Sequence, residues 1–236
     1  MMLNFCIQSL LREYGWEFLK QVALSHPVRT TRAILNSGKL DYDSEMISTF
    51  NGKTVPIFEG DKSIVGVGYC LKPLEPKCIS GRFNHDCFYL EKHLYSKNEN
   101  IPQCCKDCLI KDFGKMALNN DSAFYIMTSA KDILFDMFEP ALNDEKFSTG
   151  LFVLCRYSLK PFTLGMLASG IEGWQFPFEK GDCRDYKTWV NADEGIKNER
   201  TCITEQNEKR IKNFLNNNNS YPKKKFYKEA NIFYPE

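Results

Sequence analysis

The sequence lacks the common signatures of hydrolysis and nucleotide binding. It contains no HExxH, GxSxG, GxxxxGK(S/T) or GxGxxG motif. These motifs are typical of zinc proteases, serine hydrolases, P-loop proteins and dinucleotide-dependent enzymes. The usual hydrolase, kinase-like and dinucleotide-dependent classes are therefore not indicated, and any chemistry has to be inferred from other residues.

A charge imbalance and a long apolar run are also missing. The chain has 31 basic and 30 acidic residues, so no global field would attract it to nucleic acid or to an anionic membrane. No stretch reaches the roughly 18 apolar residues that span a bilayer, and Arg12, Glu17 and Lys20 interrupt the N-terminal apolar positions that a signal peptide would need. We expect a cytoplasmic protein with no nucleic-acid and no membrane partner.

The 236 residues are 43% apolar, which is enough to build a buried core. No internal repeat is present. We expect one α/β domain over residues 1–203, with a helical N-terminus and a cysteine-rich insertion at about 72–110. Residues 204–236 are rich in Asn and Lys, and their low apolar content predicts a polar tail made of a solvated helix and then a mobile or draped segment.

Strands and helices alternate in the second half of the chain, which predicts βαβ crossovers and a mostly parallel sheet with flanking helices. The segment LFVLC is apolar throughout, as expected for a strand that is covered on both faces. Strands are expected at 54–58, 63–69, 123–128, 150–155 and 174–178, and helices at 4–24, 28–35, 130–142, 161–169 and 183–192.

Cysteine is the most informative residue of this chain, with ten copies. Five of them, here called the central cysteines, lie in an irregular region that needs something other than a core to hold it. In the cytosol such a group is more often metal-binding than disulfide-bonded, and Cys-x2-Cys spacing lets two sulfurs reach one metal centre. The central cysteines are Cys78, Cys87, Cys104, Cys105 and Cys108.

The identity of the metal follows from the spacing of these cysteines. Zinc sites usually show two close pairs of ligands, and only Cys105 and Cys108 have that spacing, whereas iron-sulfur ligation accepts more scattered cysteines. We therefore expect a 4Fe-4S cluster bound by Cys78, Cys87, Cys105 and Cys108, with zinc as the alternative. The third interpretation is that these thiols are ordinary small buried side chains.

Two further cysteines are candidates for catalysis. Cys155 ends the apolar strand, and ligands of open α/β sheets bind at the carboxyl ends of strands. Arg156 follows it and could lower the pKa of its thiol. Cys183 lies in KGDCRDY at an expected helix start, where helix N-H groups would stabilise a thiolate. The alternatives are a packed cysteine at the strand end and an N-cap role for Asp182.

Two polar groups have a possible site role beside a structural one. His85 lies two residues before Cys87 and could ligate a metal or donate to a cluster sulfur, although a surface histidine fits equally. Thr128, Ser129 and Lys131 follow an expected strand and could hold an anion at a helix N-terminus. Helix capping explains these three residues as well.

The order of CCKDC, LIKDFGKMA, FYIMTSAKDIL and GLFVLCRYS resembles that of the cysteine-rich proteins of anaerobic microbes that are predicted to contain iron-sulfur clusters. The resemblance spans residues 78 to 183 and lies in the layout. It implies a cluster held by the central cysteines, with Cys155 facing it from a strand end.

These observations predict an iron-sulfur protein of anaerobic metabolism. If only three cysteines ligate, the open iron could bind a substrate, with Cys155 or Cys183 as nucleophile or acid in a sulfur-transfer, desulfurising or redox reaction. A small-molecule substrate or a redox partner protein would follow. A zinc-stabilised non-catalytic binding module and a simple electron carrier are the alternatives.

Overall fold

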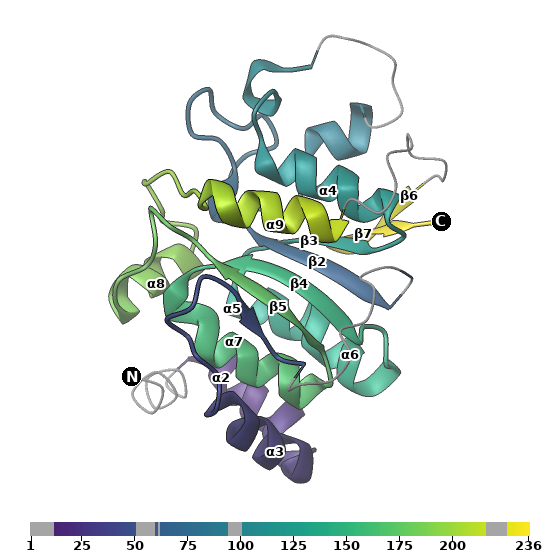
Figure 1. Ribbon diagram of the computed structural model, residues 1–236, viewed down its shortest axis with the longest axis vertical. Helices are drawn as coiled ribbons and strands as arrows, with labels where there is room; N and C mark the ends of the chain where they lie inside the picture. The colour runs from purple at the N-terminus through teal and green to yellow at the C-terminus, as the bar shows by residue number, and fades with distance from the viewer. Residues whose placement is uncertain (1–11, 51–59, 61, 94–100, 216–225) are drawn as a thin grey trace.

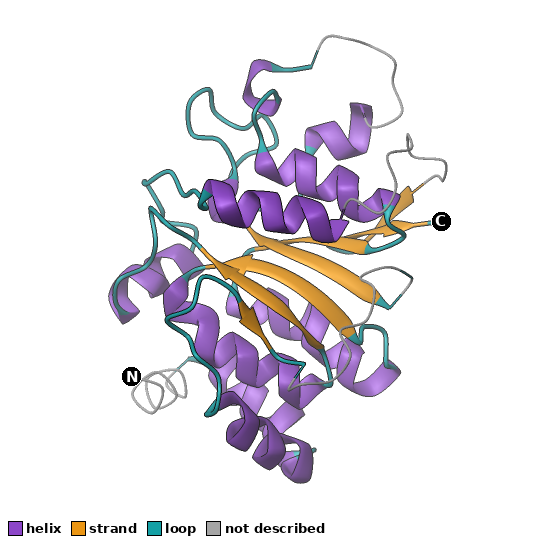
Figure 2. Cartoon of the chain, viewed as in Figure 1, coloured by secondary structure: helices purple, strands orange, loops and turns teal. Residues whose placement is uncertain are grey.

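The computed structural model describes residues 12–50, 60, 62–93, 101–215 and 226–236. These residues form an α/β protein in which one sheet is covered by helices on both faces (Figure 1). Figure 2 shows the same arrangement with the strands as a central layer. Within the described part of the chain, no helix is long and apolar enough to cross a membrane.

The sheet has seven strands in the order β1-β5-β4-β2-β3-β7-β6. The central strands β5, β4, β2 and β3 run parallel to one another, whereas β1, β7 and β6 pair antiparallel at the edges. The sheet is therefore mixed, and the expectation of a mostly parallel sheet describes only its centre. The strands are β1 (Ile47–Ser48), β2 (Ser63–Gly68), β3 (Ala123–Met127), β4 (Thr149–Leu154), β5 (Glu172–Pro177), β6 (Phe226–Glu229) and β7 (Ile232–Pro235).

The central strands are buried on both faces, as the apolar sequence of β4 predicts. Successive side chains point to opposite faces, so that Val65 and Val67 of β2 belong to one core and Ile64 to the other. The same alternation divides Val153 and Leu154 of β4 between the two cores. The sheet thus separates two apolar layers.

Helices α4 (Leu109–Asn119) and α9 (Glu205–Leu215) cover one face, and α3 (Pro27–Ser37), α5 (Ala130–Ile133), α6 (Glu139–Asp144) and α7 (Arg156–Ser169) cover the other (Figure 1). A π-helical turn, Leu134–Phe138, joins α5 to α6, which confirms the expected helix over 130–142. Helix α2 (Glu13–Phe18) continues as another π-helical turn, Leu19–Leu24, and α8 (Tyr186–Asp193) follows β5.

Two helices begin elsewhere than expected. α7 begins at Arg156, directly after Cys155, and Pro161 lies inside it instead of at its start. α8 begins at Tyr186, because Asp185 is its N-cap and accepts a hydrogen bond from the Thr188 N–H at 2.8 Å. Cys183 therefore precedes α8 and does not belong to its first turn.

Two N-terminal expectations are only partly covered by the structure. The expected strand at 54–58, and with it the hairpin, lies outside the described residues, as does the start of the expected helix at 4–24. Residues 13–24 are helical, which agrees with the amphipathic pattern of that segment. The helix expected at 28–35 is α3, which extends from Pro27 to Ser37.

The described parts of the C-terminal segment, residues 204–215 and 226–236, pack on the sheet and do not form a solvated tail. α9 packs on the sheet with Ile211 and Leu215 buried, and β7 pairs with β3, with Phe233 fully buried. The many Asn and Lys residues around 216–225 dominated the composition of the segment and hid two short strands beyond them. Composition averaged over 33 residues does not detect four-residue strands.

Candidate functional site

A cavity of about 360 Å³ lies at the carboxyl ends of the parallel strands. Gly68 ends β2, Met127 ends β3 and Leu154 ends β4, and all three line the cavity, as does Phe178 directly after β5. β2 has β3 on one side and β4 on the other, so the crossover direction reverses between β2 and β4. Open α/β sheets bind their ligands at such a reversal.

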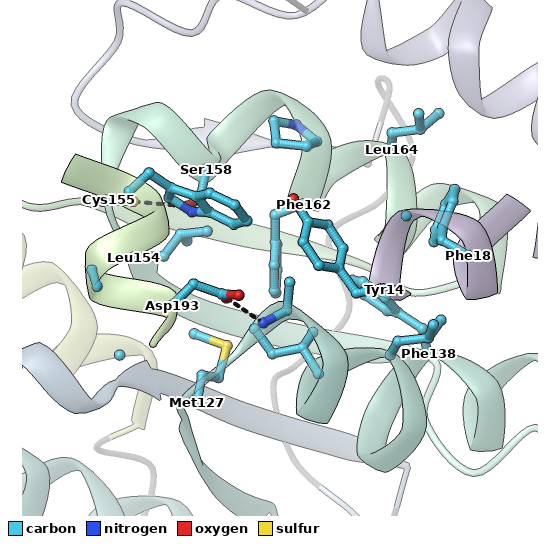
Figure 3. A pocket seen from close by; sticks show the side chains of 18 of the residues that line it. Tyr14, Phe18, Met127, Phe138, Leu154, Cys155, Ser158, Phe162, Leu164 and Asp193 are labelled. Atoms are coloured by element: carbon cyan, nitrogen blue, oxygen red, sulfur yellow. Dashed lines mark hydrogen bonds between the residues drawn. The ribbon is translucent and has the colours of Figure 1, made fainter. Parts of the chain in front are cut away.

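The wall of the cavity is mostly apolar, and Phe18, Phe138, Phe162 and Leu164 are among the side chains that form it (Figure 3). An apolar wall with a few polar groups is the usual composition of a small-molecule site, and its volume falls in the usual range of about 300–1,000 Å³. The large apolar side chains of the wall include Tyr14, Phe18, Ile34, Ile133, Leu134, Phe138, Leu154, Phe162 and Leu164.

Three cysteines that are far apart in the sequence line this cavity: Cys70, Cys155 and Cys183. Cys155 is the N-cap residue of α7, and its Sγ lies 2.7 Å from the Ser158 Oγ. Ser158 in turn accepts a hydrogen bond from the Trp189 Nε1 at 2.8 Å. The Cys155 thiol is thus held in position by a hydrogen-bonded pair at the start of α7.

Cys155 and Cys183 interact with each other, and their protonation states differ. The hydrogen bond from Cys155, together with the Lys197 ammonium 3.4 Å from the Cys183 Sγ, lowers the pKa of Cys183 to about 7. The same bond, together with burial, raises the pKa of Cys155 well above its usual value. Cys183 is therefore the more acidic thiol of the pair and ionises first, with Cys155 donating to its thiolate.

The structure corrects the electrostatic reasons that the sequence suggested. Arg156 does not give Cys155 a low pKa, and Cys183 is not at a helix N-terminus. The Asp182 carboxylate caps α7 by accepting from the Arg156 N–H at 3.0 and 3.1 Å. Burial raises the pKa of Asp182. The cation that stabilises Cys183 is Lys197, fourteen residues later in the chain, which no sequence pattern indicated.

Asp193 is a second functional candidate that the sequence analysis missed. It is the last residue of α8 and lines the cavity, where its carboxylate accepts one hydrogen bond, from the Ala130 N–H at 2.6 Å (Figure 3). Burial raises the pKa of Asp193 to about 6. Its place at the end of a polar helix gave no sign that it faces an apolar cavity.

The central cysteines gather in a second place, outside the cavity. Cys87, Cys105 and Cys108 are buried and Cys78 is half-buried. Burial and neighbouring sulfurs raise the pKa of Cys87 and of Cys105 to about 12, and burial, with a smaller contribution from Cys78, raises the pKa of Cys108. Their proximity fits a soft metal, but among the described residues no three His, Cys, Asp or Glu side chains are placed to hold a metal ion.

A buried lysine, Lys72, stands beside these thiols. Its Nζ donates to the carbonyl oxygens of Gly81 and Asn84 at 3.1 and 2.9 Å and to the Asn84 side chain, and it thereby organises the loop before Cys87. Burial lowers the pKa of Lys72, whereas Cys78 and Cys87 raise it. Its positive charge would stabilise thiolates at Cys78 and Cys87.

His85 contacts the end of β3. Its Nδ1 lies 2.8 Å from the Ile126 carbonyl oxygen and its Nε2 lies 3.0 Å from the Thr128 Oγ1. Hydrogen bonds from His85, Thr128 and Ser129 hold the pKa of Asp132 well below its usual value. The segment before Cys87 is thereby fastened to the edge of the cavity, since Thr128 also lines it.

The expected anion site at Thr128, Ser129 and Lys131 is filled by the protein's own groups. Ser129 and Asp132 form a capping box at the start of α5, and the carboxylate of Asp193 accepts a hydrogen bond from the Ala130 N–H. Lys131 pairs with Glu13 at 2.7 Å. Capping explains these residues.

In comparisons with protein-family models, with curated proteins and with solved structures, nothing matches this chain.

Proposed function

We propose that this protein is a cysteine-dependent enzyme that acts on an apolar small molecule in the cavity at the carboxyl ends of its parallel strands. The observation that carries the proposal is the Cys183 thiol beside the Lys197 ammonium, within a cavity of about 360 Å³. A low-pKa thiol at a ligand cavity is the usual arrangement of a catalytic nucleophile.

The reaction class that fits two adjacent thiols is sulfur transfer. The Cys183 thiolate would attack the outer sulfur of a bound persulfide, R–S–SH, so that the S–S bond of the substrate breaks and a new one forms on Cys183. The departing thiolate would take the proton of Cys155. The products are Cys183–S–SH, R–SH and the Cys155 thiolate, which balances atoms, charge and electrons.

The thiolate assignment predicts selective alkylation at Cys183. Iodoacetamide at pH 7, followed by peptide mass mapping, is expected to modify Cys183 before Cys202, with a rate that rises through pH 7 as the thiol ionises. Lys197→Met should slow the reaction several-fold, and Lys187→Met on the exposed side of α8 should not. Alkylation of Cys183 no faster than that of Cys202 would remove the proposal.

Sulfur transfer is tested with a small persulfide. The wild-type protein is expected to gain the mass of one sulfur atom on Cys183 and to release the corresponding thiol, and Cys183→Ser should do neither. Cys155→Ser keeps the nucleophile but removes the thiol proton, so it should slow the release of R–SH. Selective alkylation without sulfur uptake would keep the nucleophile and exclude this reaction class.

A second function, metal binding by the central cysteines, is favoured by the mutual influence of Cys78, Cys87, Cys105 and Cys108 next to the Lys72 ammonium. The donor set suits a 4Fe-4S cluster, with zinc as the alternative, and metal binding would have to draw the four sulfurs together. A cluster would supply one-electron transfer, to a redox partner protein or to the cavity.

Metal content tests this second function. On protein purified without oxygen, about four irons and four sulfides per chain would support a cluster, and one zinc without sulfide would support a structural site. The double variant Cys105→Ser/Cys108→Ser should lose the metal, whereas Cys202→Ser should retain it. Full metal content in the double variant would exclude these ligands.

A further inference from the structure

The cavity contains an isolated carboxylate. Among the described residues that line it, Asp193 has the only Asp, Glu, Lys, Arg or His side chain. The structure assigns it one hydrogen bond, from the Ala130 N–H, and no ion pair within the described residues. The nearest cation that affects it, Arg12, is paired with Glu194 at 2.6 Å. A charged group in an apolar cavity is unfavourable unless a partner arrives with the ligand.

Two aromatic rings line the same cavity as this carboxylate. Trp189 and Asp193 are four residues apart on α8, so they lie on the same face of that helix, one turn apart. The Tyr14 ring packs edge-on against Trp189, with 5.6 Å between centroids, and both side chains line the cavity. The hydrogen bond from Trp189 to Ser158 fixes the indole. A carboxylate with aromatic faces beside it is the usual environment for an ammonium group.

We propose that the ligand of this cavity is an apolar molecule with a protonated amine, whose ammonium group pairs with Asp193 beside Tyr14 and Trp189 and whose apolar body occupies the rest of the cavity. The inference deepens the proposed function, because it names the substrate class of the same cavity. It rests on the cavity being a ligand site and is independent of the thiol chemistry.

The competing interpretation is that Asp193 only caps α5. The variant Asp193→Asn separates the two, because an amide oxygen can still accept from the Ala130 N–H while the charge is gone. Glu194→Gln is the matched control. It removes a neighbouring carboxylate that is exposed and paired with Arg12 outside the cavity.

The experiment is calorimetric titration of the full-length protein at pH 7.5 with benzylamine, benzyl alcohol and benzoate, which share one shape. Benzylamine is expected to bind at least about tenfold more tightly than benzyl alcohol, since a charge-assisted hydrogen bond contributes that much, and benzoate is expected not to bind. Asp193→Asn should abolish the preference for the amine, and Glu194→Gln should preserve it.

The outcomes separate this inference from the thiol proposal. Binding of benzylamine and benzyl alcohol with equal affinity, or an amine preference that survives Asp193→Asn, would overturn the amine assignment while leaving Cys183 reactivity untouched. Conversely, alkylation of Cys183 no faster than that of Cys202 would remove the thiol proposal, whereas the preference for benzylamine is read from Asp193→Asn alone and does not depend on that result.

Discussion

At the scale of single residues, the cavity is built from groups whose environments move their pKa values in opposite directions. Cys183 has a lowered pKa and Cys155 a raised one, although both are thiols at the same site. Burial holds the pKa of Asp193 near the physiological range. Hydrogen bonds hold the pKa of Asp132, in helix α5, far below its usual value. Groups separated in this way are able to divide the roles of nucleophile, acid and anchor.

Asp193 should make the protein less stable at neutral pH. Its pKa is about 6 in the folded state and about 3.9 in an unfolded chain, so above pH 6 folding buries a charge that the unfolded state solvates. Asp193→Asn is therefore expected to raise the free energy of unfolding by about 1–2 kcal/mol at pH 7.5.

This gain should shrink as the pH falls from 6 to 4, because the folded state then takes up the proton and loses the penalty. Urea denaturation of both proteins at several pH values measures the effect. A gain that is the same at pH 4 and pH 7.5 would show that the charge of Asp193 has no part in it.

At the scale of elements, the close approach of β4 and β5 depends on Gly173, which lies opposite Gly150. Gly150 and Gly173 are register partners in these parallel strands. A Cβ on Gly173 would come within 1.8 Å of the Gly150 carbonyl oxygen, which is backbone and cannot move aside. These two strands carry Cys155 and Phe178 beyond their ends, so their spacing positions one side of the cavity.

Gly173→Ala is therefore expected to destabilise the protein by about 3 kcal/mol, since β5 would have to separate from β4. Gly38→Ala is the control, because its nearest contact would be at 3.5 Å at the end of α3 and its effect should stay within about 0.5 kcal/mol. Thermal unfolding compares the two. Equal effects of both substitutions would contradict the close approach.

At the scale of the whole molecule, the two groups of cysteines occupy different places. Cys70, Cys155 and Cys183 line the cavity, whereas none of the central cysteines does. The expectation that Cys155 faces a cluster stays a prediction, and no contact in the described residues supports it. The contact between the His85 Nε2 and the Thr128 Oγ1 connects the cysteine-rich segment to the edge of the cavity.

Residues 226–236 are part of the folded core, and a single substitution in β7 tests this. Phe233 of β7 is fully buried and packs between Phe124 and Phe226, with centroids 6.4 and 6.3 Å apart. Phe233→Ala should lower the free energy of unfolding by about 3–5 kcal/mol.

The control for this prediction lies in the same hairpin. Tyr227 of β6 is 47% exposed, and Tyr227→Ala should cost about 1 kcal/mol or less. Chemical denaturation of both variants gives the comparison. If both variants were as stable as the wild type, the segment would not be part of the core.

The sequence by itself determined the class of fold and the strands of the sheet centre, because long apolar runs such as β4 are buried on both faces whatever surrounds them. It also singled out Cys155 and Cys183, since a cysteine at a strand end is visible in a linear pattern. The starts of α7 and α8 were mispredicted, because Asp182 caps α7, which begins 26 residues earlier, and Asp185 caps α8.

Only the tertiary structure decided which groups meet. Lys197 and Cys155, which both interact with Cys183, come from separate segments of the chain. Asp193 lines a cavity whose apolar side chains come from helices α2, α3, α5 and α7 and from strands β3 and β4, among other segments. Contacts between residues far apart in the chain depend on how the crossovers pack, and no local periodicity encodes them. The short edge strands were hidden for a related reason, since β7 is stabilised by its pairing with β3 and its burial.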